Sequence, residues 1–128
     1  MFGKIQNKIM VKINRAFGTI LTDEVIITDE RKEHIIKNHG QADYDYFNKY
    51  KEIVLDDPDI IIKDCKKKGT VFIIKKVEEL DVSINIVIRL VLETDNFEYK
   101  NSVMTSYKLR DKNLQKLINR NEVVYINQ

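Results

Sequence analysis

The sequence has little of the residues that most often punctuate or cross-link a chain: one cysteine, one proline and four glycines among 128 residues. The lone Cys65 excludes an internal disulfide, and with only two histidines a zinc site would need carboxylates to complete it. No apolar run approaches the roughly 18 residues of a membrane span, and residues 1–12 lack the apolar core of a secretory signal. We therefore expect a soluble protein with no disulfide, no membrane segment and no cofactor.

Composition and charge predict one folded domain but do not indicate what it binds. A chain of 128 residues that is 43% hydrophobic and 33% charged can bury one contiguous core. The net charge of +2 is too close to balance to indicate nucleic-acid binding by itself. Acidic residues crowd 43–59, whereas lysines and arginines gather at 66–76 and 100–120. The C-terminal half is thus the candidate anion-binding half, although lysine-rich turns are also common as plain solvated surface.

Helical patterns dominate the first half of the chain. Residues 1–24 fit either a short helix or a strand, so we treat them as an N-terminal extension or first element ahead of a single domain at 24–128. Thr28 is placed to cap a helix over 29–39, which Gly40 is placed to close. Apolar and aromatic residues at three- and four-residue spacing predict a second helix over 44–55.

After Pro58 the hydrophobic period becomes that of strands. We expect strands over 60–65, 70–77, 82–93, 101–109 and 123–126, with a short helix beginning near residue 111. Helices followed by a meander of strands predict an α+β domain.

Alternation divides the strand predicted over 82–93 into two faces. One face carries only aliphatic side chains and is expected to face the core: Ile84, Ile86, Ile88, Leu90 and Leu92. The other face mixes apolar and polar side chains and is expected to form a shallow cleft: Ser83, Asn85, Val87, Arg89 and Val91. Mid-strand Arg89 has two readings, a partly buried arginine paired with a carboxylate such as Glu78, or a ligand of a substrate phosphate.

Both histidines fall on the helix predicted over 29–39. At 100° per residue, His34 and His39 lie about 140° apart, too far to share a metal ion as an i, i+4 pair does, so we predict no metal site. His34 lies with Asn38 on the polar margin, whereas His39 continues the apolar stripe of Ile35 and Ile36. One reading is structural, with His39 a hydrogen-bonded helix-end residue and His34 an ordinary surface residue.

A second reading joins the histidines to polar residues of the sheet. Transesterification of RNA needs a base for the ribose 2′-hydroxyl, an acid for the 5′-oxygen, and cations or donors for the charge of the phosphorane. Histidine suits either proton transfer. Lysine and arginine stabilise that charge, and hydroxyls hydrogen-bond a phosphate oxygen. The strands supply such residues at Lys75, Arg89, Thr105, Ser106 and Tyr107.

Three segments together resemble a known family: residues 27–35 (ITDERKEHI) with His39, residues 56–59 (DDPD) and residues 99–107 (YKNSVMTSY). As a set they look like a phage-associated nuclease group of the barnase, EndoU, colicin E5/D and RelE-like (BECR) superfamily. The similarity covers roughly residues 24–126. Members of this group resemble toxin domains of phage structural proteins and mobile elements, often at the end of a longer polypeptide.

The resemblance implies N-terminal helices packed on a curved, four- to five-stranded antiparallel sheet with an RNA-cleaving site on its open face. It implies catalytic roles for Arg31, His34, His39 and Thr105. Tyr107 stands where relatives more often have tryptophan, so its base-stacking role is less directly implied. Chemistry and strand position, not the resemblance, add substrate-binding roles for Lys75, Arg89 and Ser106.

The expected function is that of a metal-independent endoribonuclease, a toxin-type hydrolase acting on tRNA, rRNA or mRNA in the cytoplasm. A cognate inhibitor protein would restrain it, and a longer phage or secreted polypeptide is one route of delivery. The alternative is a non-catalytic binding, antitoxin or immunity module of the same fold whose basic strands grip an acidic surface. An EndoU-like or RelE-like mode with a different RNA target is a further alternative, because RNA specificity resides in loops.

Overall fold

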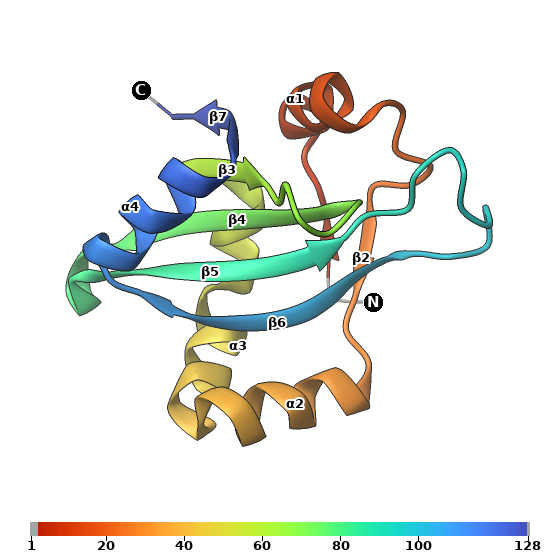
Figure 1. The fold of residues 1–128 in the computed structure, drawn as a ribbon. Coiled ribbons are helices and arrows are strands. Elements are labelled where there is room, and N and C mark those ends of the chain that lie inside the picture. The colour runs from red at the N-terminus through yellow and green to blue at the C-terminus, as the bar shows by residue number, and fades with distance from the viewer. Residues whose placement is uncertain (1–2, 128) are drawn as a thin grey trace.

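The computed structural model describes residues 3–127, which form helices on both sides of one curled sheet (Figure 1). The helices are α1 (Asn7–Phe17), α2 (Asp29–His39), α3 (Gln41–Asp56) and α4 (Asp111–Arg120), with a 3-10 turn η1 (Glu78–Leu80). The strands are β1 (Gly3–Lys4), β2 (Glu24–Ile26), β3 (Ile60–Lys63), β4 (Thr70–Val77), β5 (Val82–Arg89), β6 (Asn101–Leu109) and β7 (Glu122–Ile126). The predicted α+β class is confirmed.

The sheet within residues 3–127 has seven strands in the order β1-β2-β6-β5-β4-β3-β7. Its central strands β3 to β6 pair antiparallel, but β2 runs parallel to β6 and pairs Val25 with Asn101. The sheet is therefore mixed, and the prediction of four to five antiparallel strands was wrong. The two unforeseen strands, β1 and β2, have only two and three residues, too few for alternation to reveal them.

The main core lies between the inner face of the sheet and helices α1 and α3. Fully buried Phe47 and Val54 of α3 pack against this face, and Ile9 and Ile13 of α1 join the same cluster. The five aliphatic residues predicted for the inner face of the β5 segment all belong to it: Ile84, Ile86, Ile88, Leu90 and Leu92. Alternation thus assigned the inner face correctly.

The outer face of the sheet is only partly covered. Amphipathic α4 packs Leu114, Leu117 and Ile118 onto it, over a smaller core that includes Phe72 and Val87. Figure 1 shows α4 in front of the sheet and α3 behind it. The part of the outer face beyond α4 is the predicted cleft face.

Two predicted strands end earlier than expected. The 60–65 strand ends at Lys63, because the Asp64 side chain accepts the backbone N–H groups of Lys66 and Lys67 and turns the chain. Cys65 therefore lies in an exposed turn. The 82–93 strand ends at Arg89, although Leu90 and Leu92 continue into the core from a looping segment. The alternation of apolar residues therefore continues beyond the end of the strand, because Leu90 and Leu92 are still buried in the core.

Helix α2 lies along the edge of β6 (Figure 1). The Thr28 hydroxyl accepts the Arg31 backbone N–H at 3.2 Å and begins the helix as predicted, and Gly40 at φ 96° closes it. Ile35 is fully buried, but Ile36 is 37% exposed, so the expected two-residue apolar stripe narrows to one. Within residues 3–127, no helix is both long and apolar enough to cross a bilayer.

We expect Ile35 to hold α2 in place. Ile35→Ala should lower the free energy of unfolding by about 2–5 kcal/mol, because it leaves a cavity in the core. Ile36→Ala is the matched control, with the same change in helix propensity at the next position, and should cost about 1 kcal/mol or less. Urea unfolding of both variants tests this, and equal losses would contradict it.

Candidate functional site

A cavity of about 360 Å³ occupies the open part of the outer face. It lies between α2, the β3–β4 turn and strands β4 to β6. Its lining residues are Arg31, His34, Asp64, Lys67, Thr70, Phe72, Val87, Met104, Thr105 and Tyr107. The structure thus brings together four residues singled out from the sequence, Arg31 and His34 from α2 with Thr105 and Tyr107 from β6.

His34 is held in one ring orientation by Asn38, one helical turn later. The Asn38 side-chain nitrogen lies 2.9 Å from His34 Nδ1 and 3.1 Å from the His34 backbone oxygen. An amide nitrogen only donates, so in this arrangement Nδ1 accepts and the ring proton resides on Nε2. The half-buried His34 lines the cavity, and in this arrangement its ring donor is Nε2.

Arg31 is the cation of the α2 wall. It is half-buried and lies about one helical turn before His34. Among residues 3–127, no carboxylate forms an ion pair with its guanidinium. The Arg31 charge is thus available to an anion in the cavity.

Two neighbouring outer-face positions carry buried polar groups without partners. The Thr105 Oγ1 atom is buried and makes no hydrogen bond, and neither side-chain oxygen nor nitrogen of Asn85 has one. Thr105 lies opposite Val87, and Asn85 lies opposite Tyr107, in the β5–β6 register. Such groups cost stability, so their clustering beside one cavity marks this face as a candidate binding surface.

Tyr107 forms the end of the cavity nearest α4. The ring of exposed His39 stacks on it, with centroids 4.8 Å apart and planes at 27°. His39 therefore turns toward the cavity rim, although it does not line the cavity. Burial raises the pKa of the Tyr107 hydroxyl. The phenol is neutral at physiological pH and can donate to a phosphate.

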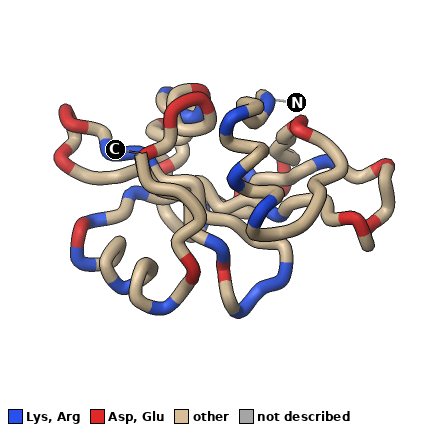
Figure 2. Tube along the Cα trace, turned by 90° about the horizontal axis from the view of Figure 1, so that it is seen from above, with Lys and Arg blue, Asp and Glu red and all other residues tan. Residues whose placement is uncertain are grey.

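Basic segments flank the cavity on the outer face. Figure 2 shows Lys and Arg along α4 and along the β3–β4 turn, which project from the same side of the sheet. The turn contributes three exposed lysines, Lys66, Lys67 and Lys68. Part of the basic charge seen in the sequence, on the turn and on α4, is thus gathered around the cavity.

Lys75 lies away from the cavity. It follows the period-two pattern of Ile73 on the inner side of β4, and its ammonium binds Asp57 at 3.2 Å and Asp59 at 3.4 Å. Asp59 also accepts the Lys76 backbone N–H at 2.6 Å. These contacts fasten the break between α3 and β3 to strand β4.

The two other predicted ligands are also occupied or enclosed. Arg89 donates to both carboxylate oxygens of Asp95, at 3.2 and 3.3 Å, and to the Leu90 backbone oxygen, so its partner is Asp95 and not Glu78. Its guanidinium lies against Gly69, where a Cβ would collide with it. Ser106 is fully buried opposite Ile86 on the core side of β6, and its Oγ makes no hydrogen bond.

Sequence reasoning did not select several residues of the site. Lys67, Thr70 and Phe72 reach the cavity because β4 lies beside β5, a pairing visible only in the fold. Asn85 had a signal, as a lone amide within an Ile- and Val-rich strand. Within the described part of the chain, no group of three or more His, Cys, Asp or Glu could hold a metal ion.

No family model matches this chain, and neither a curated protein nor a solved structure matches it significantly. The family resemblance therefore stays a prediction.

The Lys75 ion pairs should make stability depend on alkaline pH. Burial lowers the pKa of Lys75, but the hydrogen bond to Asp57 and the charges of Asp59 and Asp57 outweigh it and raise the pKa. Because the folded pKa is raised, this contribution is complete below the unfolded value of about 10.4 and is lost as pH rises through the folded value.

Urea unfolding across this range tests the contribution. The stability difference between the parent and Lys75→Met should stay constant below about pH 10 and shrink above it. Lys8→Met, at an exposed site on α1, is the control and should show no such trend. A difference that stays constant through the alkaline range would contradict the assignment.

Proposed function

We propose that this protein is a metal-independent endoribonuclease of the BECR-like toxin type, and that the outer-face cavity is its active site. One observation carries the proposal. Arg31 and His34 meet Thr105 and Tyr107 at one cavity, although more than 70 residues separate the two segments in the sequence. A cation, an imidazole and an unpaired hydroxyl are the groups that a phosphodiester needs around it.

In this proposal each histidine carries out one proton transfer. The ribose 2′-oxygen attacks phosphorus and its proton passes to His39, the exposed ring stacked on Tyr107. The bond from phosphorus to the 5′-oxygen breaks, and that oxygen takes a proton from Nε2 of the His34 imidazolium. When the His34 ring is charged, the Asn38 amide turns so that its oxygen accepts from Nδ1. A 2′,3′-cyclic phosphate and a free 5′-hydroxyl result.

Arg31 and Thr105 act on the charge that develops during this reaction. The Arg31 guanidinium neutralises the non-bridging phosphate oxygens, and the Thr105 hydroxyl donates to one of them. This donation gives the unpaired Thr105 hydroxyl a partner when substrate is bound. Tyr107 supplies an aromatic face for a flanking base.

A non-catalytic binding module is the second candidate, and one observation favours it. Phe97 and Tyr99 are 81% and 62% exposed on the loop between β5 and β6, which suits contact with a partner protein. In the ribonuclease proposal this loop is a candidate contact for the inhibitor. RNA in the cytoplasm is the proposed substrate, and tRNA, rRNA and mRNA are all candidates.

Replacing His34 should remove RNA cleavage. We expect His34→Ala to cut an RNA oligomer about 10²- to 10⁴-fold more slowly in EDTA, because the 5′-oxygen loses its proton donor. Lys37→Ala changes an exposed residue of the same helix and is the control, expected to retain the parent rate. If His34→Ala cuts RNA as fast as the parent while folded, the site assignment fails.

A substrate with a good leaving group separates acid from base. Uridine 3′-(4-nitrophenyl phosphate) releases nitrophenolate, which needs no proton, so His34→Ala should turn it over nearly as fast as the parent. His39→Phe keeps a ring for stacking on Tyr107 but cannot accept a proton, and it should be slow on both substrates. The reverse pattern would exchange the two histidine roles.

A further inference from the structure

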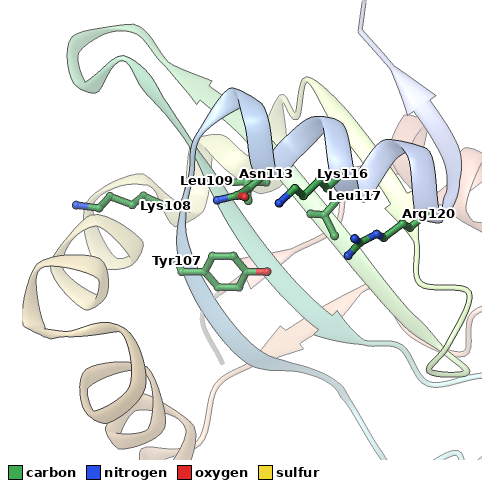
Figure 3. Close-up of a pocket in the computed structure, with 7 residues that line it drawn as sticks. All are labelled: Tyr107, Lys108, Leu109, Asn113, Lys116, Leu117 and Arg120. Carbon is green, nitrogen blue, oxygen red and sulfur yellow. The ribbon is translucent and has the colours of Figure 1, made fainter.

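A second cavity, of about 290 Å³, lies on the outer face between β6 and α4 (Figure 3). We call it the α4 groove. It is lined by Tyr107, Lys108, Leu109, Asn113, Lys116, Leu117 and Arg120. Tyr107 also lines the candidate active-site cavity, so one aromatic side chain separates the two spaces.

The α4 groove is cationic. Figure 3 shows Lys116 and Arg120 projecting from α4 on the side where the Tyr107 hydroxyl points. Across residues 3–127, neither cation has a carboxylate within ion-pair distance, nor does Lys108. The charges in the groove are therefore not neutralised by the protein itself.

Hydrogen bonds also join the groove to the neighbouring basic turn. Asn121, which follows α4, accepts the Cys65 backbone N–H at 3.0 Å and donates to the Leu117 backbone oxygen at 3.0 Å. These bonds tie the end of α4 to the β3–β4 turn that carries Lys66 to Lys68. The two basic segments are therefore joined through Asn121.

We propose that the α4 groove binds the backbone of a single-stranded RNA beyond its scissile phosphate, so that the substrate runs from the cavity across Tyr107 onto α4. Lys116 and Arg120 contact phosphates, while Tyr107 and the apolar side of Leu117 contact bases. The inference rests on the proposed function, because it needs the scissile phosphate in the cavity. It adds a substrate class, an extended single strand instead of a dinucleotide.

Binding of a non-cleavable strand tests the groove apart from catalysis. The probe is a fluorescein-labelled, 2′-O-methyl RNA of mixed sequence and about twelve nucleotides. In Lys116→Gln/Arg120→Gln, the slope of log K against log salt should be shallower by about 1.4, since each lost phosphate contact removes about 0.7. Lys8→Gln/Lys49→Gln removes two exposed charges from α1 and α3, and should leave the slope unchanged.

Cleavage of short and long substrates gives the second readout. The groove variant should cut a dinucleoside monophosphate at the parent rate but a long oligomer with a higher KM, because only the long strand reaches α4. Equal salt slopes in parent and variant would overturn the inference, as would equal losses on both substrates.

The inference and the proposed function fail in different ways. If the parent binds the probe through Lys116 and Arg120 yet cuts no RNA, that result would overturn the proposed ribonuclease activity. It would also overturn the role of the groove in that activity. A parent that cuts RNA with unchanged binding in the variant would overturn only the groove. Stronger binding of poly-glutamate than of the RNA probe would assign the groove to an acidic protein and would also overturn the inference.

Discussion

Burial of the inner face of β5 and β6 is the constraint on which the rest of the structure depends. Ile84, Ile86 and Ile88 are fixed against α3 and α1, and the antiparallel register with β6 then commits Val103 and Ser106 to the same side. A β-bulge shifts the register between Val87 and Ile88 and interrupts the alternation of β6 after Val103. Thr105, opposite Val87, and Tyr107, opposite Asn85, therefore lie on the outer face. The position of the candidate site is thus set by where the aliphatic residues must go.

The inner face of the sheet stabilises the fold, whereas the outer face carries the residues of the candidate site. The inner core is mostly aliphatic, with one unpaired hydroxyl at Ser106, whereas the outer face keeps unpaired buried groups on both Asn85 and Thr105. Each unpaired group costs about 1–3 kcal/mol, which the inner core must offset. Residues that lower the stability of the fold are expected where a surface binds a ligand. Helix α2 completes that surface because Ile35 anchors it and His39 stacks on Tyr107.

Much of the fold followed from local pattern. Thr28 and Gly40 bounded α2, and alternation identified both faces of β5. The pairing of β2 with β6 escaped prediction because a three-residue strand has no readable period, and its parallel direction depends on a distant partner. The extra length predicted for β5 shows that buried alternation does not by itself prove a strand.

The candidate site was predictable in part. The helix motif and the Thr105 segment were found because chemistry and family resemblance pointed to the same residues. Lys75 and Arg89 are engaged by Asp57, Asp59 and Asp95, and sequence alone could not show which carboxylates would reach them. The α4 groove was equally hidden, since it exists only because α4 folds back over the sheet beside Tyr107.

The chemistry of the cut ends tests the central claim most directly. Purified protein is incubated with total RNA in EDTA, and the new fragment ends are mapped and identified. The account predicts 2′,3′-cyclic phosphate ends opposite free 5′-hydroxyls. Intact RNA, or fragments that carry 3′-hydroxyl and 5′-phosphate ends, would contradict it.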